Sequence, residues 1–194
     1  MGSVREAQRR KTEARVLAAA TELFRTSGFA LTTVRDIANA AGVSAGTVMS
    51  VGDKDALLVA SFDQRIEQVH RARAGRQVTP PDGVVEQITA LIEPFAELFT
   101  ADPGLARRYG SVLVTGETES DTFTELASAL IGEIEIVLRG AGLPDTRPLA
   151  ESIYFAYIGR LFTWPPDQDQ DPNQLKRSLK HIVAAICQPE ETNA

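Results

Sequence analysis

The spacing of apolar residues constrains the fold of this chain more than any other feature. Large apolar side chains recur every three or four positions along almost the whole sequence, and no alternation of period two persists over several residues. Spacing of this kind is typical of helices that bury one face. Glycine and proline interrupt the pattern repeatedly, so the helices are separate and can pack against one another. The sequence therefore predicts an all-α fold.

The strongest interruption lies at residues 75–83, where GRQVTPPDG contains two prolines and two glycines. Such a segment ends a helix and separates two packing units. We therefore expect an N-terminal domain over residues 1–72, a linker over 73–83 and a larger helical domain over 84–194. Within the larger domain the spacing predicts helices over about 84–100, 104–115, 122–140, 147–163 and 173–187.

The N-terminal domain contains the signals of several short helices. A helix from about Thr12 to Ser27 is stopped by Gly28. Thr33 and Asp36 have the spacing of a capping box, which predicts a helix that runs to about Ala41.

The next signals indicate a tight turn. Gly42 permits a left-handed conformation, and Ser44 can cap a short helix that runs to about Ser50. Asp53 can cap a longer helix that starts near Lys54. Three short helices with a turn before the third are typical of a helix-turn-helix, here at about residues 33–52.

The charge of the chain is unevenly distributed. The net charge is −6, yet residues 1–50 hold seven basic and four acidic residues, a net charge of +3. The remaining 144 residues hold 13 basic and 22 acidic residues, a net charge of −9. A basic N-terminal segment followed by an acidic remainder is expected when one domain binds the phosphates of a nucleic acid and the other does not. A chance excess of three positive charges is the alternative.

Residues from about Arg15 to Leu58 resemble the DNA-binding domain of the TetR family. The similar elements occur in order: Gly28-Phe29, TTVRDIA at 32–38, AGVSAGTV at 41–48 and DKDALL at 53–58. The resemblance implies a transcriptional regulator, in the first instance a repressor, with an N-terminal helix-turn-helix domain. It also implies a larger helical domain that dimerises and binds a small-molecule effector.

The resemblance assigns roles to individual residues. Thr32 and Thr33 would contact phosphate, Arg35 would reach bases or phosphate, and Lys54 would hold a phosphate. The residues that would face the major groove are Ser44, Ala45, Gly46, Thr47 and Ser50. For Thr33 and Ser44 helix capping alone is the alternative role, and for Lys54 the alternative is a solvated side chain.

The chain departs from the family pattern at 49–54. The run MSVGDK is one residue shorter than usual, and Met49 occupies the place of a tyrosine that could donate to phosphate. The third helix also lacks Arg, Lys, Asn and Gln, the side chains that pair bidentately with bases. Specificity is therefore expected to rest on Arg35 and the small groove-facing residues. The basic residues Arg5, Arg9, Arg10 and Lys11 form either an arm that follows the DNA or a flexible tail.

In the larger domain, aromatic residues occur at helical spacing. Most are expected to be core, but the resemblance implies an apolar pocket. The candidates to line it are Tyr109, Phe123, Tyr154, Tyr157 and Trp164. This composition favours an apolar or aromatic effector. The last two predicted helices are expected to form a homodimer interface, with ordinary packing as the alternative. A dimer implies a roughly palindromic DNA operator.

Other classes of protein fit less well. His70, His181 and Cys187 have neither metal-ligand spacing nor a catalytic arrangement, so we expect no enzyme, no catalytic residue, no metal and no cofactor. No apolar stretch approaches the roughly 20 residues that span a bilayer, and one cysteine suits a reducing cytoplasm. The remaining alternative is a helical partner- or ligand-binding protein of the same fold whose DNA binding is weak or lost.

Overall fold

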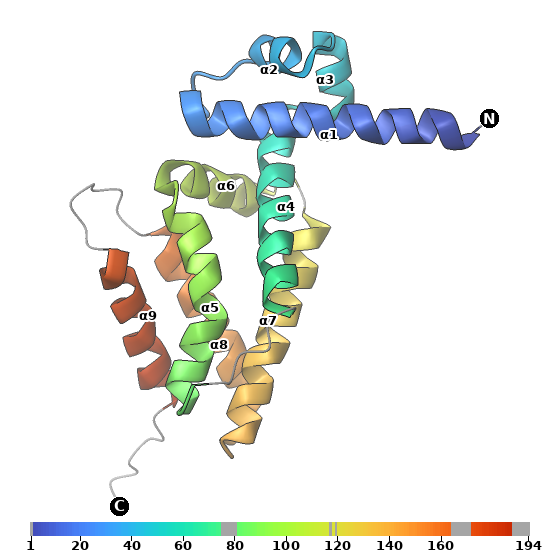
Figure 1. The fold of residues 1–194 in the computed structure, drawn as a ribbon. Coiled ribbons are helices and arrows are strands. Elements are labelled where there is room, and N and C mark those ends of the chain that lie inside the picture. The colour runs from blue at the N-terminus through green and yellow to red at the C-terminus, as the bar shows by residue number, and fades with distance from the viewer. Residues whose placement is uncertain (1, 75–80, 117, 119, 164–171, 188–194) are drawn as a thin grey trace, which may run out of the picture. The chain divides into compact units, whose positions relative to one another are not determined.

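The computed structural model describes residues 2–74, 81–116, 118, 120–163 and 172–187, and the regular structure within them is helical (Figure 1). The helices are α1 (Gly2–Ser27), α2 (Val34–Ala41), α3 (Ala45–Val51), α4 (Lys54–Ala74), α5 (Val84–Thr100), α6 (Pro103–Thr115), α7 (Asp121–Gly140), α8 (Thr146–Phe162) and α9 (Pro172–Cys187). The all-α prediction is confirmed. The bounds predicted for the last five helices agree to within one residue.

Helix α1 departs from the prediction because it begins at Gly2 rather than near Thr12. Arg9 pairs with Glu13 at 2.7 Å, and Arg10 pairs with Glu6 at 3.4 Å, both across one helical turn. Pairs at this spacing favour a helix through charged sequence. The basic residues at 5–11 therefore have a helical backbone, which corrects the alternative of a flexible tail, whereas contact of these residues with DNA stays a prediction.

Contacts divide the chain into two compact units. Unit 1 comprises residues 1–65 and 104–120, and unit 2 comprises residues 66–103 and 121–194. Helix α4 begins in unit 1 and ends in unit 2, and α6 groups with the N-terminal helices. The domain bounds 1–72 and 84–194 remain a prediction. Most of the predicted linker, residues 75–80, lies outside the described residues.

Unit 1 is built around α1, which contacts both α2 and α3 (Figure 1). Its fully buried apolar side chains come from all four N-terminal helices. They include Val16, Ala20, Phe24, Ile37, Val48, Leu57, Leu58 and Phe62. The stripes that apolar spacing predicts on each helix therefore meet in one core.

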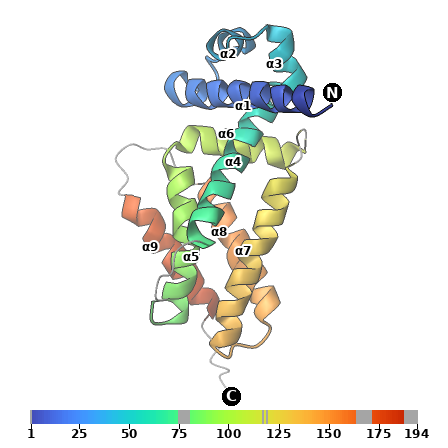
Figure 2. The same ribbon diagram turned by 45° about the vertical axis from the view of Figure 1, so that its right-hand side comes forward.

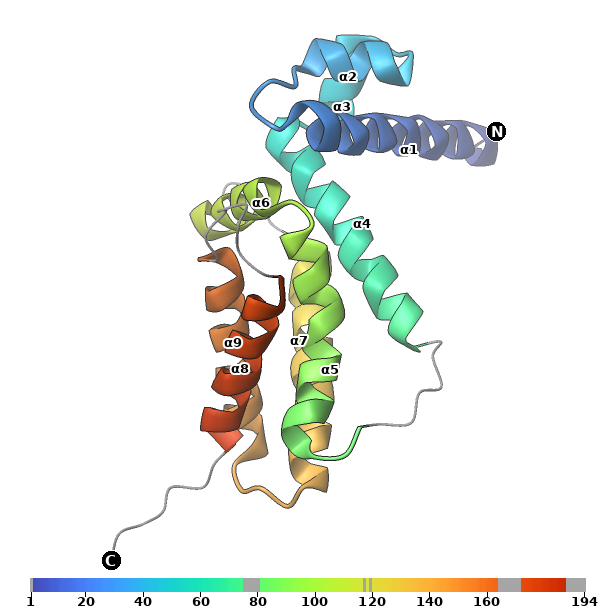
Figure 3. The same cartoon turned by 60° about the vertical axis from the view of Figure 1, so that its left-hand side comes forward.

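Unit 2 contains four helices that contact one another in a closed ring. Helix α5 packs on α7 and α9, and α8 packs on the same two helices. The four helices lie side by side in Figures 2 and 3. Side chains such as Ile88, Ile134, Leu138 and Ile153 are fully buried between them.

None of the described helices combines the length and the apolarity that crossing a membrane requires.

Candidate nucleic-acid interface and apolar cavities

The turn between α2 and α3 is only three residues long. Gly42 adopts φ 63° and ψ 44°, the left-handed conformation that ends a helix. The backbone N–H of Val43 donates to the Ala38 carbonyl at 3.0 Å, and the N–H of Gly42 donates to the Asn39 carbonyl at 3.2 Å. These bonds satisfy the last carbonyls of α2 and fix the direction in which the chain enters α3.

Arg15 adds a long-range support to this turn. From α1, its guanidinium donates to the Ala41 carbonyl and, at 3.3 Å, to the Gly42 carbonyl. A positive charge at the C-terminal end of α2 also complements the helix dipole. Sequence reasoning missed this role because the two segments lie 26 residues apart and no local signal pairs them.

Helix α3 is held by a cap at one end and a buried side chain near its middle. The Ser44 hydroxyl accepts from the Thr47 N–H at 3.1 Å, and Val48 is fully buried in unit 1. The predicted groove-facing residues Ser44, Ala45, Gly46 and Ser50 are exposed, and Thr47 is half-buried. Met49, in the position of the missing tyrosine, is 53% exposed. The predicted groove face is thus open to a partner.

The two threonines before α2 have different environments. Thr33 caps α2: its hydroxyl accepts from the Asp36 N–H at 3.2 Å, and its own N–H donates to the Asp36 carboxylate at 2.9 Å. The Thr33 hydroxyl also donates to the Asp36 carboxylate at 2.6 Å, and this hydrogen bond, together with that from the Thr33 N–H, lowers the pKa of Asp36. Thr32 is only 2% exposed, and its hydroxyl donates to the carbonyls of Gly28 and Leu23. The expectation of a phosphate contact by the Thr32 side chain is therefore corrected.

Arg35 and Lys54, two basic residues with predicted DNA contacts, differ in their contacts with the rest of the protein. Arg35 is exposed and has no hydrogen bond or ion pair within the described part of the chain. The ammonium of Lys54 lies 4.2 Å from the centre of the Phe29 ring, which orients this side chain by a cation–π contact. Arg108 of α6 also lies over Phe29 and pairs with Asp55 at 2.8 Å.

An aromatic cavity lies within unit 2. Its volume is about 20 Å³, and its walls come from α4, α5, α7 and α8. The lining residues are Ile66, His70, Phe95, Phe99, Phe123, Leu126, Ala127, Leu130, Tyr154, Tyr157 and Ile158. The structure thus brings together three of the predicted pocket residues, Phe123, Tyr154 and Tyr157. Burial raises the pKa of Tyr154 to about 12 and also raises the pKa of Tyr157, so both phenols stay protonated.

The other two predicted pocket residues are not part of this cavity. Tyr109 belongs to unit 1, where it is fully buried, stacks on Phe62 at 4.5 Å and donates to Asp63 at 3.2 Å. The expectation that Tyr109 lines the pocket is corrected, because its face of α6 packs on the first half of α4. Burial raises the pKa of Asp63, which also accepts from Ser120. Trp164 lies outside the described residues.

His70 is the imidazole of the cavity, and its ring lies 4.7 Å from the Phe95 ring. Burial lowers the pKa of His70, the positive charge of Arg73 lowers it further, and Glu133 opposes this effect. A histidine whose pKa is lower in the folded state resists protonation there, whereas the unfolded chain takes up the proton near pH 6.5. Stability is therefore expected to fall as the pH drops below about 6.5.

The pH dependence can be measured by urea unfolding between pH about 7.5 and 5.5. His70→Phe should lose less stability than the wild type over this range. His181→Asn is the matched control, because His181 is exposed on α9, and it should behave as the wild type. An equal loss of stability in wild type and His70→Phe would contradict the prediction.

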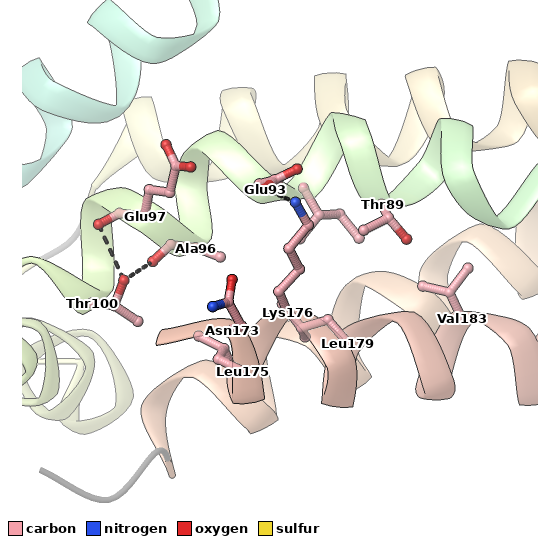
Figure 4. A pocket seen from close by; sticks show the side chains of 11 residues that line it. Thr89, Glu93, Ala96, Glu97, Thr100, Asn173, Leu175, Lys176, Leu179 and Val183 are labelled. Atoms are coloured by element: carbon pink, nitrogen blue, oxygen red, sulfur yellow. Dashed lines mark hydrogen bonds and ion pairs between the residues drawn. The ribbon is translucent and has the colours of Figure 1, made fainter. Parts of the chain in front are cut away.

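A second hollow of about 130 Å³ lies between α5 and α9 (Figure 4). Lys176 reaches across it from α9 to the Glu93 carboxylate on α5, and the Thr100 hydroxyl donates to the Ala96 carbonyl at 2.8 Å. This hollow shares no lining residue with the aromatic cavity and has no aromatic wall. Within the described residues no group of His, Cys, Asp and Glu could hold a metal ion.

Comparisons with known proteins agree with this geometry. Residues 16–60 match the family model for bacterial regulatory proteins of the tetR family. Comparison with curated protein sequences gives no match.

Solved structures share the fold. FadR from Thermus thermophilus, a TetR-family transcriptional repressor in complex with lauroyl-CoA, is 24% identical, with 94% of this chain and 98% of that chain covered and a TM-score of 0.63. A TetR transcriptional regulator from Rhodococcus sp. RHA1 is 16% identical (91% and 95% covered, TM-score 0.65). The superantigen PfiT is 21% identical (89% and 95% covered, TM-score 0.57).

With α2 and α3 joined by a left-handed glycine turn and the outer face of α3 exposed, the chain is a helix-turn-helix DNA-binding protein. Residues 16–60 are similar to the N-terminal domain of the tetR family of bacterial regulatory proteins, and the chain shares its fold with solved structures of TetR-family regulators.

Proposed function

We propose that this protein is a transcriptional repressor that leaves its operator when a small apolar or aromatic effector binds unit 2. The observation that carries the proposal is helix α4. It begins at Lys54 in the DNA-binding unit, and further along it contributes Ile66 and His70 to the wall of the aromatic cavity. A ligand that moves this wall acts on the same helix that carries the helix-turn-helix. Such a ligand shifts the equilibrium by its different affinity for the two arrangements.

We propose the aromatic cavity, rather than the larger hollow between α5 and α9, as the effector site. Its lining is predominantly apolar, with few polar groups, as in ligand sites generally. The larger hollow contains no residue of α4. The lauroyl-CoA bound by the similar FadR of Thermus thermophilus contains a long apolar chain, which supports an apolar effector for this protein as well.

We propose that Thr33, Arg35, Ser44, Ala45, Gly46, Thr47, Ser50 and Lys54 form the DNA contacts. Six of these residues are exposed, Thr47 and Lys54 are half-buried, and both short helices are capped, which supports this assignment. Ser44 can combine capping with phosphate contact, since a hydroxyl that accepts from the backbone can still donate to phosphate. The Thr33 hydroxyl donates to the Asp36 carboxylate at 2.6 Å, so its donation to a phosphate would replace this hydrogen bond. The small residues of α3 would touch thymine methyl groups.

Replacing Arg35 with alanine is expected to weaken binding to operator fragments by about 1–3 kcal/mol and to relax sequence preference at one position of each half-site. The measurement is a titration of fluorescent duplexes that differ at single positions. Arg25→Ala is the control, because Arg25 is an exposed arginine of α1 that pairs with Glu22. Unchanged sequence preference in Arg35→Ala would count against base reading by this residue.

A homodimer through α8 and α9 is part of the proposal. Four residues at helical spacing on α8, Ser152, Phe155, Ala156 and Gly159, lie outside the core of unit 2. Phe155 is 66% exposed among small neighbours, and such a residue is typical of an interface anchor. On α9, Ser178 accepts from Arg160 of α8 at 2.9 Å, which joins the two helix faces. A dimer would place two α3 helices on a roughly palindromic operator.

Phe155→Asp is expected to raise the dimer dissociation constant about thirtyfold or more, since an interface anchor contributes about 2 kcal/mol or more. Light scattering after size exclusion measures the mass. Ile136→Asp is the matched control, because Ile136 is 65% exposed and belongs to α7, which is not one of the two helices of the proposed interface. A Phe155→Asp protein that remains dimeric at low concentration would overturn this interface.

The second candidate function is a partner- or ligand-binding protein of the same fold with weak or lost DNA binding. Met49 in the place of a phosphate-binding tyrosine favours it, and so does the similarity to the superantigen PfiT. Binding to random duplex DNA at low salt separates the two. A regulator binds with a steep salt dependence, whereas absence of salt-sensitive binding would overturn the repressor proposal.

Selection of bound fragments from genomic DNA then tests the operator. Recovery of a two-fold symmetric site, and its release by an apolar compound that binds unit 2, are the expected results. Fragments without a shared site would contradict sequence-specific regulation.

A further inference from the structure

A mostly buried guanidinium lies beside Phe95, one of the residues that line the aromatic cavity. Arg73 lies in the last turn of α4, one turn after His70, and its side chain is only 16% exposed. The guanidinium pairs with Glu133 of α7 and lies 5.3 Å from the centre of the Phe95 ring, which lines the cavity. Arg73 and His70 thus contact the same aromatic ring.

This guanidinium is incompletely satisfied. Its Nη2 donates to the Glu133 carboxylate, but Nη1 is buried and has no hydrogen-bond acceptor among the residues that the structure describes. An arginine remains protonated in proteins and carries five N–H donors. A buried donor without an acceptor has lost its hydrogen bonds to water and destabilises the folded state until an acceptor is supplied.

The surroundings restrict which acceptor fits. The cavity lining is aromatic or aliphatic apart from His70 and the tyrosine hydroxyls. Glu133 already neutralises Arg73, so a second carboxylate at Nη1 would be repelled by the first. A neutral oxygen acceptor has no such repulsion.

We propose that the effector is an apolar molecule with a neutral carbonyl group, whose oxygen accepts from Arg73 Nη1 while its apolar part lies among Phe95, Phe123 and Tyr154. This inference rests on the proposed effector site. The cavity of about 20 Å³ is large enough for one water molecule but not for such a ligand, so its walls must separate on binding. That movement would link occupancy to α4.

The test uses matched probes of nearly equal shape with the full-length protein. One set is acetophenone, α-methylstyrene and benzoate, and the other is 2-decanone, 2-methyl-1-decene and nonanoate. Within each set the apolar part is the same, and the ketone, the alkene and the carboxylate differ only in the group attached to it. Calorimetric titration measures their affinities. In at least one set the ketone should bind about tenfold more tightly than the alkene and than the carboxylate, the difference that one buried hydrogen bond makes.

Variants assign the preference to the proposed atoms. Arg73→Met should bind the alkene as the wild type does but bind the ketone no more tightly than the alkene. Arg71→Met is the control, because Arg71 is 66% exposed one turn from Glu67, its partner, and it should retain the preference. Glu133→Gln leaves the Arg73 charge without its counter-ion, so this variant should prefer the carboxylate to the ketone. Circular dichroism verifies that each variant is folded.

Three outcomes would overturn the inference. Equal binding of ketone and alkene by the wild type would exclude a carbonyl-specific site but leave an apolar effector site intact. Retention of the ketone preference in Arg73→Met would exclude Arg73 as the donor. Absence of binding by all six probes would count against the effector site itself, and the inference would fail with it.

Discussion

Gly42→Val is expected to abolish binding to operator fragments while unit 2 keeps its helices. Gly42 has φ 63°, a conformation that costs a residue with a Cβ atom about 1–2 kcal/mol and a β-branched residue more. A Cβ atom there would also lie 2.9 Å from the Arg15 guanidinium, which donates to the carbonyls at the turn. The substitution therefore removes the turn that orients α3 together with its long-range support.

Fluorescence anisotropy with selected operator fragments measures the loss, and far-UV circular dichroism measures helix content. Gly42→Asn is the graded comparison, because asparagine tolerates the left-handed conformation better, and it should lose less affinity. Gly132→Ala in α7 is the control, because an added Cβ meets nothing within 4 Å. This variant should bind as the wild type does. Wild-type affinity in Gly42→Val would show that operator binding does not depend on this turn.

Phe24→Ala is expected to destabilise unit 1 by about 3–5 kcal/mol, the usual cost of truncating a buried phenylalanine to alanine. Phe24 is fully buried, and its ring centre lies 5.2 Å from that of Phe29. Phe29 in turn lies beneath the Lys54 ammonium. The space left by the removed Phe24 ring would therefore weaken the core of unit 1. It would also loosen the Phe29 ring, which orients Lys54, a predicted phosphate contact.

Urea unfolding followed by circular dichroism, together with operator binding at 37 °C, measures this effect. Phe24→Leu is the conservative comparison and should cost less than about 1.5 kcal/mol, because it retains most of the apolar volume. A loss smaller than about 1 kcal/mol in Phe24→Ala would contradict the packing described for this core.

The pairing of α6 with the N-terminal helices adds a feature that apolar spacing does not indicate. Arg108 holds Asp55 through both carboxylate oxygens at 2.8 Å, and Tyr109 holds Asp63. Both acidic residues belong to the first three turns of α4. An ion pair and a hydrogen bond therefore join α6 to the segment of α4 that follows the helix-turn-helix. A division of the chain by sequence order alone places α6 with the larger domain.

Local signals were sufficient for the helices and for the turn. Gly28 and Gly42 both have positive φ and end their helices, while Thr33 and Ser44 cap the next two. Capping and left-handed turns depend on residues within four positions of one another, so their chemistry can be read directly from the sequence. For the same reason the all-α class and the helix-turn-helix were predictable, and the order of family motifs made the DNA-binding role recognisable.

Partners distant in the sequence were decided by the tertiary structure alone. Packing buries Thr32 but leaves Thr33 exposed, although the two are adjacent and chemically identical. Arg15 donates a hydrogen bond to the α2–α3 turn, Tyr109 donates one to Asp63, and Arg73 donates one to Glu133. The partners are 26 to 60 residues apart in the sequence. Each pairing depends on which helices lie side by side, and the spacing of apolar residues reveals the buried face of a helix but not its neighbour. The sequence by itself thus determined the helices and the helix-turn-helix motif. The tertiary structure decided that Arg15 supports the turn by hydrogen bonds and which side chains line the aromatic cavity.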